Sequence, residues 1–248
     1  MLKNKVALIT GASRGIGAAT AVLLGRNGCQ VGVNYHSNRE AADGIVEEII
    51  SSGSQALAVQ ADVRSADDVR RMVGEILDRF GKIDILVLNA GMPVPVKPFT
   101  ELSYDEFIEK TKGETDCFVR TLQEVVPHMI GRSEGTIVGI SSGLSRYPSP
   151  GFSSHSMAKS GVDGLMKSLA MELGPQGIRV NTVAPGLTET DATAFIPAEQ
   201  IQAMAQMTPL RRIAQPEDVA GAVLCVVSDH MRFVTGTYIP VSGGILMP

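Results

Sequence analysis

A glycine-rich stretch near the start of the chain, residues 10–17, has the composition of a phosphate-binding turn. It follows a short apolar run, residues 6–9, and leads into a helix-forming segment that ends at Arg26. The N-terminus of a helix offers free backbone N–H groups and the positive end of its dipole, and both favour a pyrophosphate. We therefore predict that a nucleotide binds here, in contact with Gly11, Ser13, Arg14, Gly15, Ile16 and Gly17.

The three glycines of this turn have the spacing G-x-x-x-G-x-G. We expect Gly11 to permit the tight turn, Gly15 to let the ligand approach the backbone, and Gly17 to let the helix pack closely. An ordinary turn between a strand and a helix can also be rich in glycine. The assignment therefore depends on the rest of the chain.

Strand-like and helix-like runs alternate along all 248 residues. This alternation predicts an α/β fold, a single-domain Rossmann-like doubly wound parallel sheet of about seven strands with helices on both faces. The expected strands are 6–9, 30–35, 55–60, 83–88, 136–140, 179–184 and 238–241. The expected helices are 39–51, 65–80, two stretches between 103 and 129, 155–173 and 216–228. A polar stretch of weak periodicity, residues 187–209, is expected to act as a mobile lid.

The composition excludes several classes of function. The net charge is −4 and no basic stripe is present, which argues against nucleic acid as a partner. The longest apolar run, residues 219–227, is too short to span a membrane, and the first strand leaves no room for a signal peptide. Three widely spaced cysteines indicate reduced thiols and a cytoplasmic protein. The four histidines are scattered, so we expect no metal site.

The end of the second expected strand bears on the choice of cofactor. NAD enzymes usually place an acidic residue there to bind the ribose 2′-hydroxyl, and that carboxylate repels a 2′-phosphate. Here the position is Tyr35, and no acid occurs before Glu40. Together with Arg14, the residues Ser37, Asn38 and Arg39 could face a phosphate, although they could also be solvated turn residues. We therefore predict NADP(H) as the cofactor.

Over nearly its whole length the chain resembles the short-chain dehydrogenase/reductase family, and most of all its 3-oxoacyl-acyl-carrier-protein reductases and their relatives. The resemblance rests on the glycine turn and on ordered motifs at 62–63, 89–91, 181–186, 208–210, 216–220 and 241–244. It implies that Asp62 and Val63 lie at the adenine. It also implies that the cofactor is contacted by Asn89, Ala90, Gly91, Pro185, Gly186, Thr188 and Thr190.

The same resemblance implies a catalytic set of Ser, Tyr, Lys and Asn, with Tyr and Lys spaced as Y-x-x-x-K. In this sequence Ser142 and Lys159 are present, but His155 stands at the tyrosine position and Gly113 at the asparagine position. The family's Ser polarises the carbonyl, its Tyr delivers the proton, and its Lys holds the nicotinamide ribose. Two of the four roles therefore lack the expected residue.

His155 is a candidate for the missing acid, because histidine exchanges protons near neutral pH. Two effects oppose this role: Lys159, one helical turn away, favours the neutral imidazole, and histidine is shorter than tyrosine. The alternative is a polar residue that lines a cavity. Tyr147 could also swing in as a donor, but a substrate-loop aromatic is the simpler interpretation. For Asp116 and Cys117 we expect solvated surface and core packing, respectively.

Three hypotheses for function remain. The first is an NADPH-dependent carbonyl reductase with an atypical acid, acting on a small-molecule ketone, free or carrier-bound, of acyl or polyketide type. The second is non-redox chemistry such as cyclisation, isomerisation or dehydration on the same fold. The third is a catalytically impaired partner subunit of a related reductase. The resemblance also implies a homotetramer or homodimer, built on helices 114–129 and 155–173 and on the C-terminal segment 238–248.

Overall fold

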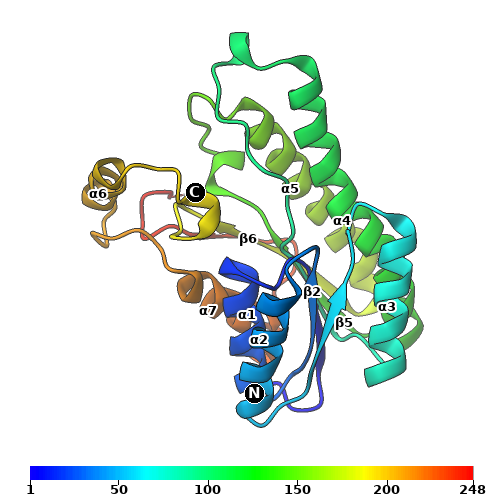
Figure 1. Cartoon of the computed structure of the whole chain (residues 1–248). Coiled ribbons are helices and arrows are strands. Elements are labelled where there is room, and N and C mark those ends of the chain that lie inside the picture. The colour runs from blue at the N-terminus through cyan, green and yellow to red at the C-terminus, as the bar shows by residue number, and fades with distance from the viewer. Residues whose placement is uncertain (248) are drawn as a thin grey trace.

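The apolar runs along the chain form one parallel sheet. The computed structural model describes residues 1–247 and arranges seven strands in the order β3-β2-β1-β4-β5-β6-β7 (Figure 1). All six strand pairings are parallel. The strands are β1 (Val6–Ile9), β2 (Gln30–Tyr35), β3 (Ala56–Gln60), β4 (Ile85–Leu88), β5 (Gly135–Ile140), β6 (Ile178–Pro185) and β7 (Tyr238–Val241). The predicted Rossmann-like fold is confirmed.

Helices cover both faces of this sheet (Figure 1). They are α1 (Gly15–Arg26), α2 (Arg39–Ser51), α3 (Ala66–Phe80), α4 (Tyr104–Arg132), α5 (Ser153–Leu173), α6 (Ala198–Met207) and α7 (Pro216–Val227). Apolar residues of α1, α2 and α7 form one core cluster with the sheet, and those of α3, α4 and α5 form the other. Successive residues of β1 alternate between the two clusters, because neighbouring side chains of a strand point to opposite faces.

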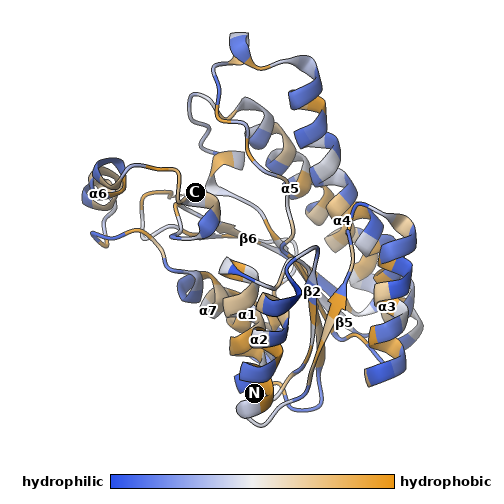
Figure 2. Cartoon of the chain, in the orientation of Figure 1, coloured by the Kyte–Doolittle hydropathy of each residue, from blue (hydrophilic) through white to orange (hydrophobic). Residues whose placement is uncertain are grey.

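Aliphatic side chains dominate both core clusters, as expected of a parallel sheet covered on both faces. Figure 2 shows hydrophobic residues along the strands and hydrophilic residues on the outer faces of the helices. Phe118 is the largest side chain that is fully buried. None of the helices in residues 1–247 is long and apolar enough to cross a membrane.

The strand order reverses next to β1, which pairs with β2 on one side and β4 on the other. In an open parallel sheet, ligands bind at the carboxyl ends of the strands beside such a reversal. The glycine turn follows β1 and the segment Asn89–Gly91 follows β4, so both lie at this point. The fold therefore places the cofactor motifs together.

Two local predictions require correction. The region between residues 103 and 129 forms one continuous helix, α4, instead of two stretches. Ser103 and Glu106 form a capping box that starts the helix, and the helix continues through Pro127 because its buried stripe runs on to Met129. The segment 187–209 is also not irregular throughout, since it contains α6, which stands apart from the sheet in Figure 1. Its role as a lid stays a prediction.

Candidate active site and cofactor cleft

The glycine turn has a backbone that requires glycine at each of its three positions. Gly11 and Gly15 adopt positive φ values of 61° and 55°, in the left-handed region that other residues rarely occupy. At Gly17, an added Cβ would lie 2.3 Å from the carbonyl oxygen of Gly11 and 2.5 Å from Nδ2 of Asn89. Gly17 is therefore needed for close packing against the turn itself.

Asn89 and Thr10 fix this turn to the end of β4. The Asn89 side chain donates to the carbonyl oxygens of Thr10 and Gly11, at 2.9 and 3.0 Å. In return, the Thr10 hydroxyl accepts the backbone N–H groups of Asn89 and Ala90, at 2.9 and 3.0 Å. The motifs after β1 and β4 thus form one hydrogen-bonded unit, which holds the turn in a single shape.

The start of α1 suits the pyrophosphate of a dinucleotide. Its N-cap, Arg14, makes no side-chain cap, and the first turn of the helix carries no acidic residue. The turn is open above Gly15, where the nearest atom to an added Cβ is the Thr190 methyl group at 3.4 Å. The residues present therefore fit an anionic group that approaches the backbone at Gly15, with Thr190 beside it.

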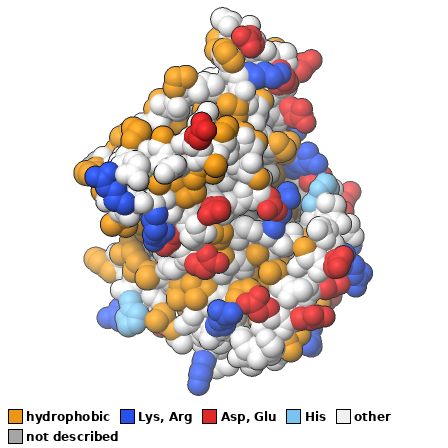
Figure 3. All heavy atoms as spheres, turned by 60° about the vertical axis from the view of Figure 1, so that its left-hand side comes forward, with side chains coloured by type: hydrophobic (Ala, Val, Ile, Leu, Met, Phe, Trp, Pro, Cys, Tyr) orange, Lys and Arg blue, Asp and Glu red, His pale blue; other side chains and the backbone are white. Residues whose placement is uncertain are grey.

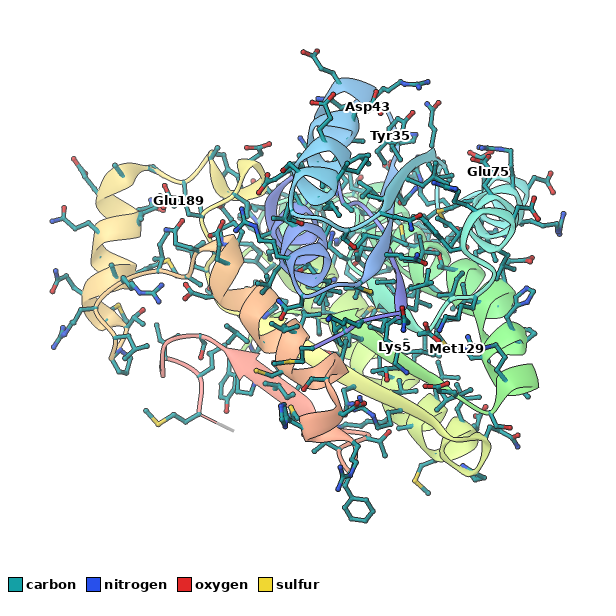
Figure 4. The ribbon with its side chains drawn as sticks, turned by 90° about the horizontal axis from the view of Figure 1, so that it is seen from below. Lys5, Tyr35, Asp43, Glu75, Met129 and Glu189 are labelled. Atoms are coloured by element: carbon teal, nitrogen blue, oxygen red, sulfur yellow. The ribbon has the colours of Figure 1, made fainter. Side chains whose placement is uncertain are left out.

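The residues at the end of β2 have several different roles. Tyr35 is buried in the core, and the Asn38 side chain caps α2 by accepting the N–H of Ala41 at 3.0 Å. Arg39 pairs with Asp43 one turn further along α2, while Arg14 lies 3.6 Å from Asp191. Figure 4 shows Tyr35 and Asp43 on the α2 side of the molecule, and Glu189 beside α6. Arg14 and Arg39 are both mostly exposed, and each forms an ion pair at the surface.

Asp62 ends the segment after β3, and its carboxylate accepts a two-pronged hydrogen bond from the guanidinium of Arg64. This contact holds the pKa of Asp62 at about 2. Val63 is buried beside it. At the other end of the cleft, Pro185 closes β6, Gly186 donates its N–H to the carbonyl of Val241, and Thr188 is buried. These residues follow the carboxyl ends of β3 and β6, at the same edge of the parallel sheet as the glycine turn.

Ser142 follows β5 and begins a single 3-10 turn. Its hydroxyl oxygen accepts the N–H of Leu144 at 3.2 Å, which leaves the hydroxyl hydrogen free to donate. The Tyr238 hydroxyl donates to the carbonyl of Ser142 at 3.2 Å and fixes the backbone there. Ser142 can therefore donate a hydrogen bond to a substrate carbonyl.

His155 lies in the first turn of α5 and is largely buried. Burial lowers its pKa to about 3, and the positive charges of Lys110 and Lys159 act in the same direction. Its ring atom Nδ1 has no hydrogen-bond partner. The imidazole is therefore neutral at physiological pH, which argues against an imidazolium ion as the acid.

Lys159 is buried one turn further along α5, and its ammonium group is held on two sides. Nζ donates to the carbonyl of Ile140 at 2.8 Å and lies 2.6 Å from Oε1 of Glu114. Lys110 donates to the other carboxylate oxygen of Glu114, also at 2.6 Å. The motif-based prediction leaves Lys110 and Glu114 out. The sequence did contain a signal, because both residues fall on the buried stripe of α4: Lys110 is eight residues before Phe118, and Glu114 is four residues before it.

Gly113 is buried on α4, and Met92 occupies the space beside it. A Cβ at this position would lie 2.6 Å from Cγ of Met92 and 2.8 Å from its sulfur. At the position where the resemblance implies an asparagine, the Met92 side chain thus occupies the space that a side chain would need. Gly113 and Met92 are packed as a pair.

The three other candidates have ordinary surroundings. The Tyr147 hydroxyl donates to the carbonyl of Met247, so it is engaged with the C-terminal tail. Asp116 forms ion pairs with Lys112 and Arg120 on the same helix. Cys117 packs in the core, where burial raises its pKa to about 12, and the predicted core packing is confirmed. Within residues 1–247 no group of three or more potential metal ligands occurs.

Comparison with known proteins agrees with this geometry. Residues 11–246 match the family model described as "Enoyl-(Acyl carrier protein) reductase". The chain is 38% identical over 250 residues to the 3-oxoacyl-[acyl-carrier-protein] reductase FabG of Staphylococcus aureus, covering 100% of both chains. Among solved structures, a dehydrogenase/reductase from Sinorhizobium meliloti superposes with a TM-score of 0.92 at 33% identity, covering 99% of this chain and 96% of that one. An NAD+-bound xylitol dehydrogenase superposes with a TM-score of 0.88 at 27% identity, covering 98% and 99%.

Proposed function

We propose that this chain, which belongs to the short-chain dehydrogenase/reductase family, is an NADP(H)-dependent carbonyl reductase. The observation that carries the proposal is the cleft itself, in which the glycine turn, Ser142 and Lys159 are all retained. The ammonium group of Lys159 has three N–H donors; it donates one to the carbonyl of Ile140 and forms an ion pair with Glu114. It can therefore also donate to a cofactor ribose.

The preference for NADP(H) depends on this chain's own residues, because the xylitol dehydrogenase named above holds NAD+. No acid stands at the end of β2, and Arg14 before α1 and Arg39 at the start of α2 are both mostly exposed. A guanidinium group binds a phosphate through parallel hydrogen bonds, whereas a ribose hydroxyl offers it much less. These two arginines therefore favour a 2′-phosphate.

When bound, the nicotinamide supplies the hydride. Ser142 then orients the substrate by donating its hydroxyl hydrogen to the carbonyl oxygen. Neutral His155 carries a single N–H, so it can donate a hydrogen bond but is a poor source of a proton. The cleft consequently binds and polarises a ketone well but protonates it slowly. We expect a reductase with a low turnover rate.

The substrate proposed is a ketone of acyl or polyketide type, free or carrier-bound. The segment around α6 exposes the large apolar side chains Phe195, Met204, Met207 and Leu210. Figure 3 shows hydrophobic side chains interspersed with charged ones on the side of the molecule that carries α6. An apolar chain on the substrate would cover this surface if the segment closes as a lid.

The experiment that tests the reductase is NADPH oxidation over a panel of ketones and β-ketoacyl thioesters. Turnover that is lost in Ser142→Ala supports the proposal. NADPH binding without turnover of any ketone would favour the second candidate, non-redox chemistry. A specific observation supports that candidate, since the unpartnered Nδ1 of His155 leaves a ring nitrogen free to hydrogen-bond and orient a substrate hydroxyl in isomerisation or dehydration. Neither activity would favour the impaired partner subunit.

We further propose a cytoplasmic homotetramer, or a homodimer. Helices α4 and α5 pack on each other, and α5 has three glycine or serine residues (Ser160, Gly161, Gly164) where a second copy could approach closely. At both glycines an added Cβ would meet nothing within 4 Å in a single chain. Light scattering at micromolar concentration tests this, and a monomer would contradict it.

A further inference from the structure

Three charged side chains are buried together at the catalytic corner, the region that contains Ser142, His155 and Lys159. Lys110 is 2% exposed, Glu114 0% and Lys159 6%. The Glu114 carboxylate lies between the two ammonium groups, 2.6 Å from each. Burying charges costs free energy that their mutual attraction offsets only when the geometry is good. The remainder of the buried stripe on α4 is mostly apolar, so this cluster stands out at the end nearest Ser142 and His155.

The cluster joins four parts of the fold. Glu114 accepts the backbone N–H of Met92 at 3.1 Å, and Lys110 donates to the carbonyl of the same residue at 2.8 Å. Both contacts fix the segment directly after the motif Asn89–Gly91. A Cβ at Gly91 would lie only 3.1 Å from Oε1 of Glu114. Glu114 therefore connects the cofactor segment after β4, helix α4, and Lys159 on α5, whose ammonium group also reaches β5.

The carboxylate also determines the charge of the cluster. Burial would raise the pKa of Glu114, but the attraction of Lys159 and Lys110 prevails and lowers it to about 2. Burial lowers the pKa of Lys110, and the carboxylate offsets only part of this effect. Without Glu114, two ammonium groups would face each other in a buried space. The carboxylate thus supplies the negative charge that offsets the two buried ammonium groups.

We propose that Glu114 is a positioning residue of the reductase site, which together with Lys110 holds the Lys159 ammonium group oriented towards the cofactor. This inference rests on the proposed reductase function. Glu114 lies directly after Gly113, where the family's asparagine is missing and Met92 fills the space. A buried charge cluster therefore stands where the resemblance implies an asparagine, and it supports Lys159 by direct contact.

The groups that face the Lys159 ammonium are few. From α4 they are Glu114, Lys110, the Cys117 thiol and the Phe118 ring, whose centroid lies 5.4 Å from Nζ. From α5 the facing group is His155, and from β5 it is the carbonyl of Ile140. With a pKa of about 12 for Cys117 and about 3 for His155, neither titrates between pH 7 and pH 9.5. A pH dependence in this range therefore does not come from Cys117 or His155.

The test is the affinity for NADPH, measured by fluorescence titration of the full chain between pH 7 and pH 9.5. In the wild type we expect a flat profile. In Glu114→Gln the carboxylate that opposes the effect of burial on the pKa of Lys110 is lost, so the affinity should become pH-dependent and change roughly three- to tenfold across the range. Lys110→Met/Glu114→Gln removes the like charge and should restore a flat profile at lower affinity.

Lys112→Met is the matched control, because Lys112 is an exposed neighbour on α4 that pairs with Asp116. It should behave as the wild type. A merely structural Glu114 would give a Glu114→Gln variant with a lower Tm and a flat profile, and that result overturns the proposal. So does a wild type that binds no nucleotide. A wild type that binds NADPH but reduces no ketone contradicts the proposed function alone, because the binding profile still decides the role of Glu114.

Discussion

The two halves of the cleft are built in different ways. Around the glycine turn, the backbone makes most of the contacts, and the polar side chains, Asn89 and Thr10, satisfy it. Around the catalytic corner, side chains make most of the contacts. Three charged side chains are buried in one cluster, and Nδ1 of His155 has no hydrogen-bond partner. The first half contains the residues that the sequence motifs predict for a nucleotide site, whereas the second has His155 and Gly113 at the positions where the resemblance implies tyrosine and asparagine.

This contrast has a physical origin. A turn that binds a ligand through its backbone needs glycine at particular positions, because every other residue has a side chain that would fill the space. A corner that binds through side chains can replace several of them together, provided that size and charge remain balanced. Met92 beside Gly113, and Lys110 beside Glu114, are pairs matched in size and in charge, respectively.

The largest effect is expected in the backbone-built half. In Gly17→Ala the added Cβ would lie 2.3 Å from the Gly11 carbonyl oxygen, so the turn must shift. A displacement of about 1 Å in an active site can lower a reaction rate about a hundredfold. We expect a loss of NADPH affinity of similar size, about a hundredfold, because the turn contacts the nucleotide directly. The measurement is calorimetric titration. Gly44→Ala on α2 is the control, because its Cβ meets nothing within 4 Å, and it should bind normally.

In the side-chain-built half, His155→Tyr should raise ketone reduction. The tyrosine restores a proton donor next to Lys159, and a positioned acid supplies at least about a hundredfold when its geometry is ideal. We expect about a 10- to 100-fold gain in kcat/KM, measured by NADPH oxidation. His155→Phe, which has the ring without the hydroxyl, is the control and should show no gain. Loss of a native activity in both variants would instead assign His155 to a non-redox reaction.

How far the sequence predicts the molecule follows the same division. Alternating apolar runs predict all seven strands, because the sheet is covered by helices on both faces and its strands are therefore rich in apolar residues. The sequence does not predict that α4 continues through Pro127, because a proline inside a helix removes one hydrogen bond and usually ends the helix. Here the packing of the buried stripe outweighs that loss. The matched pairs at the catalytic corner include residues far apart in the sequence, such as Met92 and Gly113.

The charge cluster could have been predicted in part. Lys110 and Glu114 are four residues apart, a spacing that usually indicates an exposed pair on a helix surface. Their register is the stronger signal, because they continue the buried positions of α4 that include Cys117, Phe118 and Thr121. What the sequence does not contain is the partner from α5, since the approach of Lys159 depends on how the two helices pack.

A smaller effect is expected for the choice of nucleotide. NADPH should bind about tenfold more tightly than NADH, because Arg14 can form charge-assisted hydrogen bonds with a 2′-phosphate. In Arg14→Ala this advantage should largely disappear while NADH affinity stays the same, as judged by calorimetry with both nucleotides. Arg26→Ala, at the far end of α1 and paired with Glu48, is the control. Equal affinities in the wild type would remove the basis for NADP(H).

The smallest effect is expected from restoring the asparagine. In Gly113→Asn the new side chain meets Met92, whose flexible end must move, at a cost of about 1–2 kcal/mol of stability measured by urea unfolding. In the double variant Gly113→Asn/Met92→Ala, the shorter side chain at position 92 makes room for the asparagine, so part of the lost stability should be recovered. Gly131→Asn, on the same helix with nothing within 4 Å of its Cβ, is the control and should cost little.

In the His155→Tyr background, Gly113→Asn/Met92→Ala should add less than about threefold in kcat/KM, well below what the tyrosine adds. The reason is that Glu114 already lies 2.6 Å from Lys159, so an asparagine supplies a support that the site has in another form. A gain as large as that of the tyrosine would show that the family's arrangement is superior and that Glu114 does not replace it. In that case the catalytic corner would differ from the family's arrangement only because it lacks two residues, and the cluster of Lys110, Glu114 and Lys159 would not be a substitute for them.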